Sequence, residues 1–153
     1  MAAAPLVSGY HPLVPVQQDG AWTTKFFDAE QAELVAAICE RIIPTTDTPG
    51  ARAALVHQYI DLILSEATTE RRAAFQRGLV PFAGTDDARK DELLAEIADG
   101  AFFSDLKELT VAGYYGSGVG MKEELGFEGR TFVTRFDGCT HPEHLEWSPP
   151  ADE

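Results

Sequence analysis

The fold is decided by residues 28–43, which read DAEQAELVAAICERII. Asp28 and Gln31 have the spacing of a capping box, a pattern that begins helices. Apolar side chains then recur at helical spacing along one face: Leu34, Ile38 and Ile42, with Val35 beside them. Because a proline disfavours helical backbone in the residue before it, Pro44 predicts that this amphipathic helix ends after Ile43.

Four further segments carry helical signals. We expect helices at about 51–65, from 68 or 69 to about 82, at about 86–99 and at about 102–115. The apolar residues expected to face inward in these segments are Leu55, Tyr59 and Leu62 or Ile63, then Phe75, Leu79 and Phe82, then Leu93, Leu94 and Ile97, then Phe102, Leu106 and Leu109. The sequence therefore predicts a mainly α fold, a compact bundle of about five helices with long irregular N- and C-terminal arms.

The chain divides by composition into three parts. Residues 1–27 hold three prolines and form an N-terminal docking arm, residues 28–116 form the helical core, and residues 117–153 form a C-terminal arm with an acidic tail. A length of 153 residues with 44% hydrophobic composition fits one domain with its own core. The net charge of −13, without a basic stripe, argues against nucleic-acid partners, and no apolar stretch has the length of a membrane span.

Three groups of residues could suggest chemistry. Gly113, Gly116, Gly118 and Gly120 lack the preceding strand and the spacing of a phosphate-binding loop, so we interpret them as a helix end and a turn. Cys39 with His57 resembles a thiol and a base, but the apolar surroundings of Cys39 favour a buried structural thiol. Candidate metal ligands gather in one short tail segment: Cys139, His141, Glu143 and His144. A single cluster interrupted by a proline is more typical of a solvated tail than of a zinc site.

The sequence thus offers no catalytic constellation, but its two arms carry many aromatic residues. Arms of this length cannot usually bury their own rings, and a large exposed apolar area is costly, so we expect the arms to dock on a partner protein. Aromatic side chains suit such contacts because they bury much area with few rotatable bonds. The expected interface residues are Tyr10, Trp22, Tyr114, Tyr115, Phe127, Phe132, Phe136 and Trp147. For Tyr114 and Tyr115, packing inside the chain is an equal alternative. Cys139 is a further candidate, for a disulfide to another subunit.

Four phrases of the sequence resemble a known family. They are FFDAEQ at residues 26–31, IIPTTDTPGA at 42–51, FSDLKELTVAGYYGS at 103–117 and ELGFEG at 124–129. Together they resemble the small subunit of gluconate 2-dehydrogenase, the subunit 3 family, which includes small subunits of related FAD-dependent glucose and sugar dehydrogenases. The resemblance covers roughly residues 10–137.

The resemblance implies a non-catalytic accessory chain. Its partner would be a large oxidoreductase of the glucose–methanol–choline type, which holds FAD and the catalytic residues, so this chain itself would carry no cofactor and no metal. A cytochrome c subunit often accepts the electrons in such complexes. The small subunit would act as a chaperone in a heterodimer, assisting folding, maturation or export.

The N-terminal residues bear on location. Family members often carry a twin-arginine signal, whereas residues 1–7 have no basic region and no apolar core. We therefore expect a periplasmic protein if a leader has been removed, and a cytoplasmic one otherwise.

Two other functions remain open on sequence alone. The chain could be a stand-alone acidic adaptor that binds a basic protein, because its surface charge is strongly negative. A small metal-dependent enzyme built around His141 and His144 is the third hypothesis.

Overall fold

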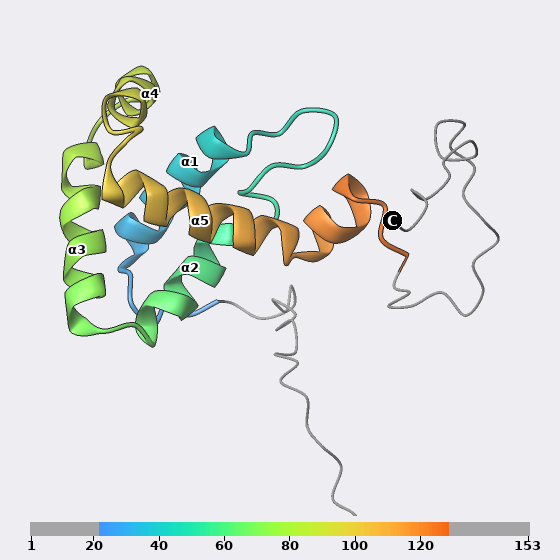
Figure 1. Ribbon diagram of the computed structural model, residues 1–153, viewed down its shortest axis with the longest axis horizontal. Coiled ribbons are helices and arrows are strands. Elements are labelled where there is room, and N and C mark those ends of the chain that lie inside the picture. The colour runs from blue at the N-terminus through green and yellow to red at the C-terminus, as the bar shows by residue number, and fades with distance from the viewer. Residues whose placement is uncertain (1–21, 129–153) are drawn as a thin grey trace, which may run out of the picture.

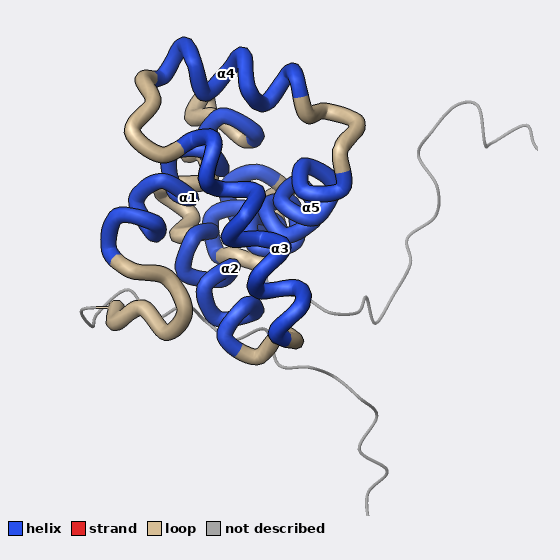
Figure 2. Tube along the Cα trace, turned by 90° about the vertical axis from the view of Figure 1, so that its left-hand side faces the viewer, coloured by secondary structure: helices blue, strands red, loops and turns tan. Residues whose placement is uncertain are grey.

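The computed structural model describes residues 22–128 of the chain. Its elements in chain order are α1 (Ala29–Ile42), α2 (Val56–Ser65), α3 (Thr69–Leu79), the 3-10 turn η1 (Val80–Phe82), α4 (Asp87–Glu96), α5 (Ala101–Tyr115) and the π-helical turn η2 (Val119–Glu124). The described part contains helices and loops but no strand (Figure 2). The expected mainly α fold is confirmed.

Short polar side chains begin three of the helices. They are the N-cap residues Asp28 of α1, Thr68 of α3 and Asp86 of α4, each of which accepts a hydrogen bond from a backbone N–H of the first helical turn. At α1 the expected capping box is complete, since the Gln31 side chain also accepts from the Asp28 N–H. These caps satisfy N–H groups that have no partner within the helix.

Helices α1, α2 and α5 pack on one another and form the centre of the molecule (Figure 1). Helix α3 packs against α2 and α5, and α4 lies at the edge next to η1. The buried apolar side chains come from every α-helix and include Val35, Ile38, Ile60, Leu64, Phe75, Leu79, Phe82, Leu93, Leu106 and Leu109. Each large side chain of this kind stabilises the fold by about 1.5–3 kcal/mol when it is fully buried.

The second helix differs from its prediction. It begins at Val56 rather than near Ala51, because Leu55 has the left-handed backbone conformation with φ of 56° and closes a turn before the helix. Val56, Ile60 and Leu64 are fully buried, whereas the expected Tyr59 and Ile63 are only partly buried against the core and Leu55 lies before the helix. The helix is therefore rotated by about one residue, and this rotation carries a carboxylate, Asp61, into the interior.

Parts of both predicted arms belong to the folded body. Phe27 is buried in the core, and its ring centre lies 6.0 Å from that of Phe75. After α5, the segment expected to be irregular forms η2, which packs on the end of α5. The folded body therefore extends beyond the boundaries at residues 27 and 117 that composition had indicated.

Candidate partner-binding site

The loop between α1 and α2 is held in place by one carboxylate. Glu40 accepts hydrogen bonds from the Thr45 N–H at 2.8 Å, the Thr45 hydroxyl at 2.7 Å and the Arg52 N–H at 2.8 Å. Burial acts to raise the pKa of Glu40, but these hydrogen bonds and the nearby Arg52 charge together lower it below its usual value. At Gly50 a side chain would have no room, since a methyl group there would lie 2.5 Å from the Glu40 carboxylate.

The same loop is tied to the C-terminal end of α5. The Tyr114 hydroxyl donates to the Pro49 carbonyl at 2.8 Å, and the Thr48 hydroxyl donates to the Glu124 carboxylate at 2.5 Å. Figure 1 shows the loop extending beside this end of the molecule. Three of the four phrases that carry the family resemblance therefore meet in space, although they lie up to 76 residues apart in sequence.

The junction between α5 and η2 is closely packed. The Ser117 hydroxyl donates to the Tyr114 carbonyl at 2.6 Å and accepts from the Gly120 N–H at 3.0 Å. A methyl group on Gly120 would lie 2.2 Å from the Tyr114 carbonyl oxygen, so only glycine fits there. The expected helix end is confirmed at Gly116, which caps α5, whereas Gly113 lies within α5. The expected turn is replaced in part by a further helical turn, which Gly118 and Gly120 begin.

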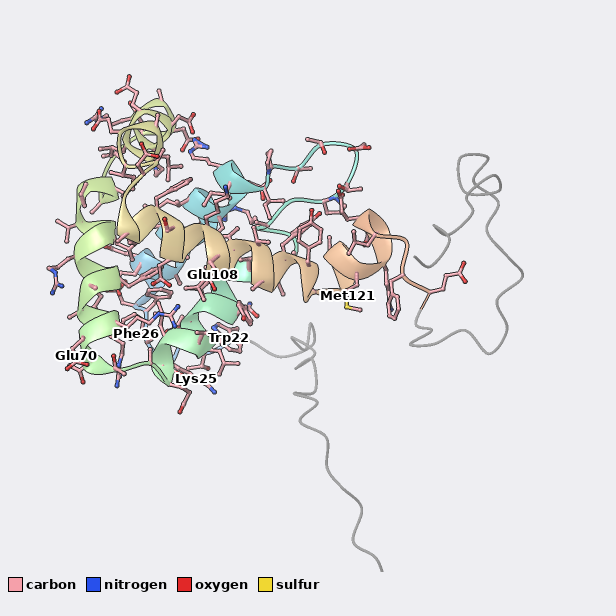
Figure 3. The ribbon with its side chains drawn as sticks, in the orientation of Figure 1. Trp22, Lys25, Phe26, Glu70, Glu108 and Met121 are labelled. Carbon is pink, nitrogen blue, oxygen red and sulfur yellow. The ribbon has the colours of Figure 1, made fainter. Side chains whose placement is uncertain are left out.

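The remaining phrase, at residues 26–31, is held from the opposite side of the core. Both carboxylate oxygens of the buried Asp61 accept backbone N–H groups, from Lys25 at 2.8 Å, Phe26 at 3.0 Å and Phe27 at 2.8 Å. Figure 3 shows Trp22, Lys25 and Phe26 beside α2 at the edge of the body. Asp61 was not singled out from sequence; the signal was an acidic residue inside the apolar run YIDLIL at 59–64.

The expected interface residues have different environments. Tyr114 is buried, so its ring packs within the chain, whereas Tyr115 is exposed on α5. Trp22 and Phe127 are half-buried, and the Trp22 indole N–H is buried without a hydrogen-bond partner among the described residues. The other expected residues, Tyr10, Phe132, Phe136, Trp147 and Cys139, lie outside the described residues.

The thiol that sequence marked as structural is buried and free. Burial, with a smaller contribution from the Glu40 charge, raises the pKa of Cys39 to about 12, and the Thr110 hydroxyl 3.3 Å from Sγ offsets this only in part. Burial and then the Arg52 charge lower the pKa of His57. A thiol with this pKa stays protonated near neutral pH, so Cys39 is not an activated nucleophile.

Comparison with known protein families identifies the chain's relatives. The profile of the family described as gluconate 2-dehydrogenase subunit 3 matches residues 29–131, from the first residue of α1 to beyond η2. The chain belongs to this family. It is thus related to a subunit of a dehydrogenase complex, an accessory chain that associates with other subunits. Comparisons with curated proteins and with solved structures give no match.

The described residues provide neither a metal site nor a membrane-spanning helix. Between residues 22 and 128, histidine, cysteine and carboxylate side chains form no group of three able to hold a metal ion. The segment His141–His144, which held the candidate metal ligands with Cys139, lies beyond the described part. In the same range no helix combines the length and the apolar character needed to cross a bilayer.

Proposed function

We propose that this chain is a non-catalytic small subunit that binds, stabilises and helps mature a large FAD-dependent oxidoreductase of the glucose–methanol–choline type. The substrate of that partner would be a sugar, polyol or glycoside. In this proposal the flavin and the catalytic residues belong to the partner, and a cytochrome c subunit accepts its electrons.

The family match is the observation that carries the proposal. It covers residues 29–131 and so includes every described helix rather than a single motif. The resemblance of the four phrases points to the same kind of complex, and three of them converge at the end of the molecule where Tyr114 and Glu124 hold the loop between α1 and α2.

The physical character of the folded body also supports a binding role. The loop between α1 and α2 is fixed by the multiply bonded carboxylate of Glu40, and the N-terminal segment is fixed by the buried carboxylate of Asp61. A framework that is already ordered loses little conformational entropy when it binds a partner. Such rigidity suits a chain that provides a surface on which a larger subunit folds.

The proposal is tested by co-expression with a large flavoprotein of the glucose–methanol–choline type from the same source organism. We expect the two proteins to co-elute as a yellow complex, and we expect the soluble yield and dye-reducing activity of the flavoprotein to fall when this chain is omitted. An unrelated helical protein of similar negative charge is the control. Equal yields with and without this chain, and separate elution, would contradict the proposal.

The net charge of −13 favours a second candidate, an acidic adaptor for a basic protein that carries no flavin. Attraction between exposed charges weakens strongly as salt is added. Binding to a basic, flavin-free protein that disappears between low and high salt, together with no binding to the flavoprotein, would favour this alternative.

A further inference from the structure

Large hydrophobic side chains are exposed mainly in one region of the described chain. Four such side chains are exposed: Val80 at 69%, Val111 at 38%, Tyr115 at 40% and Leu125 at 62%. Three of them belong to the second half of α5 and to the residue that caps η2. Val111 and Tyr115 are one helical turn apart, so they lie on the same side of α5. We call the surface of Val111, Tyr115 and Leu125 the α5–η2 face.

Leu125 is joined to the other two through the backbone of η2. Its N–H donates to the Gly120 carbonyl at 3.1 Å, and a methyl group on Gly120 would lie 2.9 Å from the Tyr115 Cα. Leu125 is therefore one helical turn away from Gly120, which lies against the backbone of Tyr115. Figure 3 shows Glu108 along α5 and Met121 on η2, which mark the two parts of this region.

The aromatic ring of the face, Tyr115, packs against a buried neighbour. The rings of Tyr115 and Tyr114 meet edge to face, with centres 5.2 Å apart and planes at 87°. Tyr114 is itself 1% exposed, and its hydroxyl is bonded to the Pro49 carbonyl. Because Tyr115 packs against this fixed neighbour, it can bury a large area on binding at a small entropic cost. This is a common property of residues that dominate binding energy.

The charges along the face indicate the chemistry of its partner. The charged side chains between residues 107 and 125 are all exposed, and they are Lys107, Glu108, Lys122, Glu123 and Glu124. Three carboxylates thus accompany two ammonium groups, in a chain whose net charge is −13. A second copy of this chain would carry the same charge, so repulsion disfavours it as the occupant. A partner with arginine or lysine beside an apolar patch complements the face.

We propose that the α5–η2 face is the surface through which this chain binds its flavoprotein subunit, and that the flavoprotein presents an apolar patch edged with arginine or lysine. The inference rests on the function proposed above and assigns it to one surface. The apolar centre excludes water and supplies the affinity, while the acidic edge selects the partner and speeds its association.

The test compares two substitutions of equal chemistry. Leu125→Asp places a charge on the face, whereas Val80→Asp places one on a side chain of similar exposure on η1, at the other end of the molecule (Figure 1). Binding of each full-length variant to the co-expressed flavoprotein is measured by titration, and circular dichroism checks that each variant is folded. We expect Leu125→Asp and, independently, Tyr115→Ala to weaken binding at least about tenfold, and Val80→Asp to leave it unchanged.

A charge reversal tests the second half of the proposal. Glu108→Lys combined with Glu123→Lys should weaken binding and reduce its dependence on salt, because the partner's edge is basic. Tighter binding of this double variant would overturn the assignment of a basic partner.

The outcomes separate the two proposals. If the wild-type chain binds no flavoprotein, the proposed function fails and this inference fails with it. Should the wild type bind but Leu125→Asp and Tyr115→Ala bind equally well, the function stands and the α5–η2 face is overturned as its site. If these variants abolish only a dimer of the isolated chain, the face belongs to a second copy, and the inference is again overturned.

Discussion

Residues 22–27 and residues 117–128 both flank the main helices, yet they are attached to the folded body in different ways. The N-terminal segment is bound through its backbone, with three successive N–H groups on the buried Asp61, and it places Phe27 in the core. The C-terminal segment forms its own helical turn on α5 and leaves Leu125 exposed. The first segment completes the core, whereas the second adds to the surface that we propose for binding.

The largest effect is expected from Asp61→Ala. This change leaves three N–H groups without their acceptor in a buried or half-buried position, so we expect the free energy of unfolding to fall by about 3 kcal/mol. Urea unfolding measures the loss, and Trp22 fluorescence in a Trp147→Phe background reports release of the N-terminal segment. Asp61→Asn, which keeps one acceptor oxygen, should lose less, and the exposed Asp99→Ala should lose almost nothing. Equal stability of Asp61→Ala and Asp99→Ala would show that the N-terminal segment is not attached as described.

The C-terminal segment is tested by a pair of glycines two residues apart. Gly120→Ala forces a methyl group against the Tyr114 carbonyl, whereas Gly118 has open space around it and an ordinary φ of −63°. We expect Gly120→Ala to cost about 2 kcal/mol and to release η2 from α5, and Gly118→Ala to change stability by less than about 0.5 kcal/mol. Thermal unfolding gives the stability change, and hydrogen exchange at residues 119–127 locates it. Indistinguishable variants would mean that η2 does not pack closely on α5.

Ionisation of Cys39 should affect both segments equally, because this thiol lies in the core between α1 and α5. Its pKa is raised from 9.0 to about 12, so above about pH 9 the unfolded chain releases a proton that the folded chain retains. The contribution of this thiol to stability is constant below that pH and should then fall by about 1.4 kcal/mol per pH unit as the pH rises towards 12. Denaturant unfolding at pH 8 and pH 10 measures the difference. The same experiment on Cys39→Ala is the control and should lack this contribution; identical slopes would contradict the assignment.

The smallest effect concerns the loop on the C-terminal side. Tyr114→Phe removes the hydrogen bond to the Pro49 carbonyl and should cost about 1 kcal/mol. Hydrogen exchange of residues 45–50 should become faster, while exchange in the segment bound by Asp61 should not change. Tyr115→Phe is the matched control, because it removes a hydroxyl from an exposed ring. Faster exchange at both ends of the molecule would show that the two segments are coupled.

The helices were predicted well from the sequence because the N-cap interactions that begin them join residues only three positions apart. Asp28, Thr68 and Asp86 each bond to a backbone N–H three positions ahead, an interaction that the sequence shows directly. The inward residues Phe75, Leu79 and Phe82 were also predicted correctly, since the helical period places them on one face.

The failures arise from packing and hydrogen-bond contacts that the local sequence pattern does not show. The prediction for helix α2 considered only its apolar residues and did not single out Asp61. Asp61 faces inward, since N–H groups 34 to 36 residues earlier in the chain satisfy it. Likewise, the glycines after α5 suggested a turn, and nothing in the local sequence shows that Gly120 must fit against the Tyr114 carbonyl.

For the candidate site, the sequence predicted which types of residue take part but not which of them are exposed. Aromatic side chains at the end of α5 were expected at an interface, but sequence could not tell that Tyr115 is exposed while its neighbour Tyr114 is buried. That distinction depends on the loop between α1 and α2, whose contacts with Tyr114 and Glu124 join residues 65 and 76 positions apart.

The position of Asp61 also has a consequence for the order of events during synthesis. Phe27 leaves the ribosome 34 residues before its acceptor does. At about 5–20 residues per second, roughly two to seven seconds pass before Asp61 follows it. During this interval Phe26 and Phe27 lack the carboxylate that fixes their backbone in the finished fold, so a chaperone or targeting factor can engage them before Asp61 binds them.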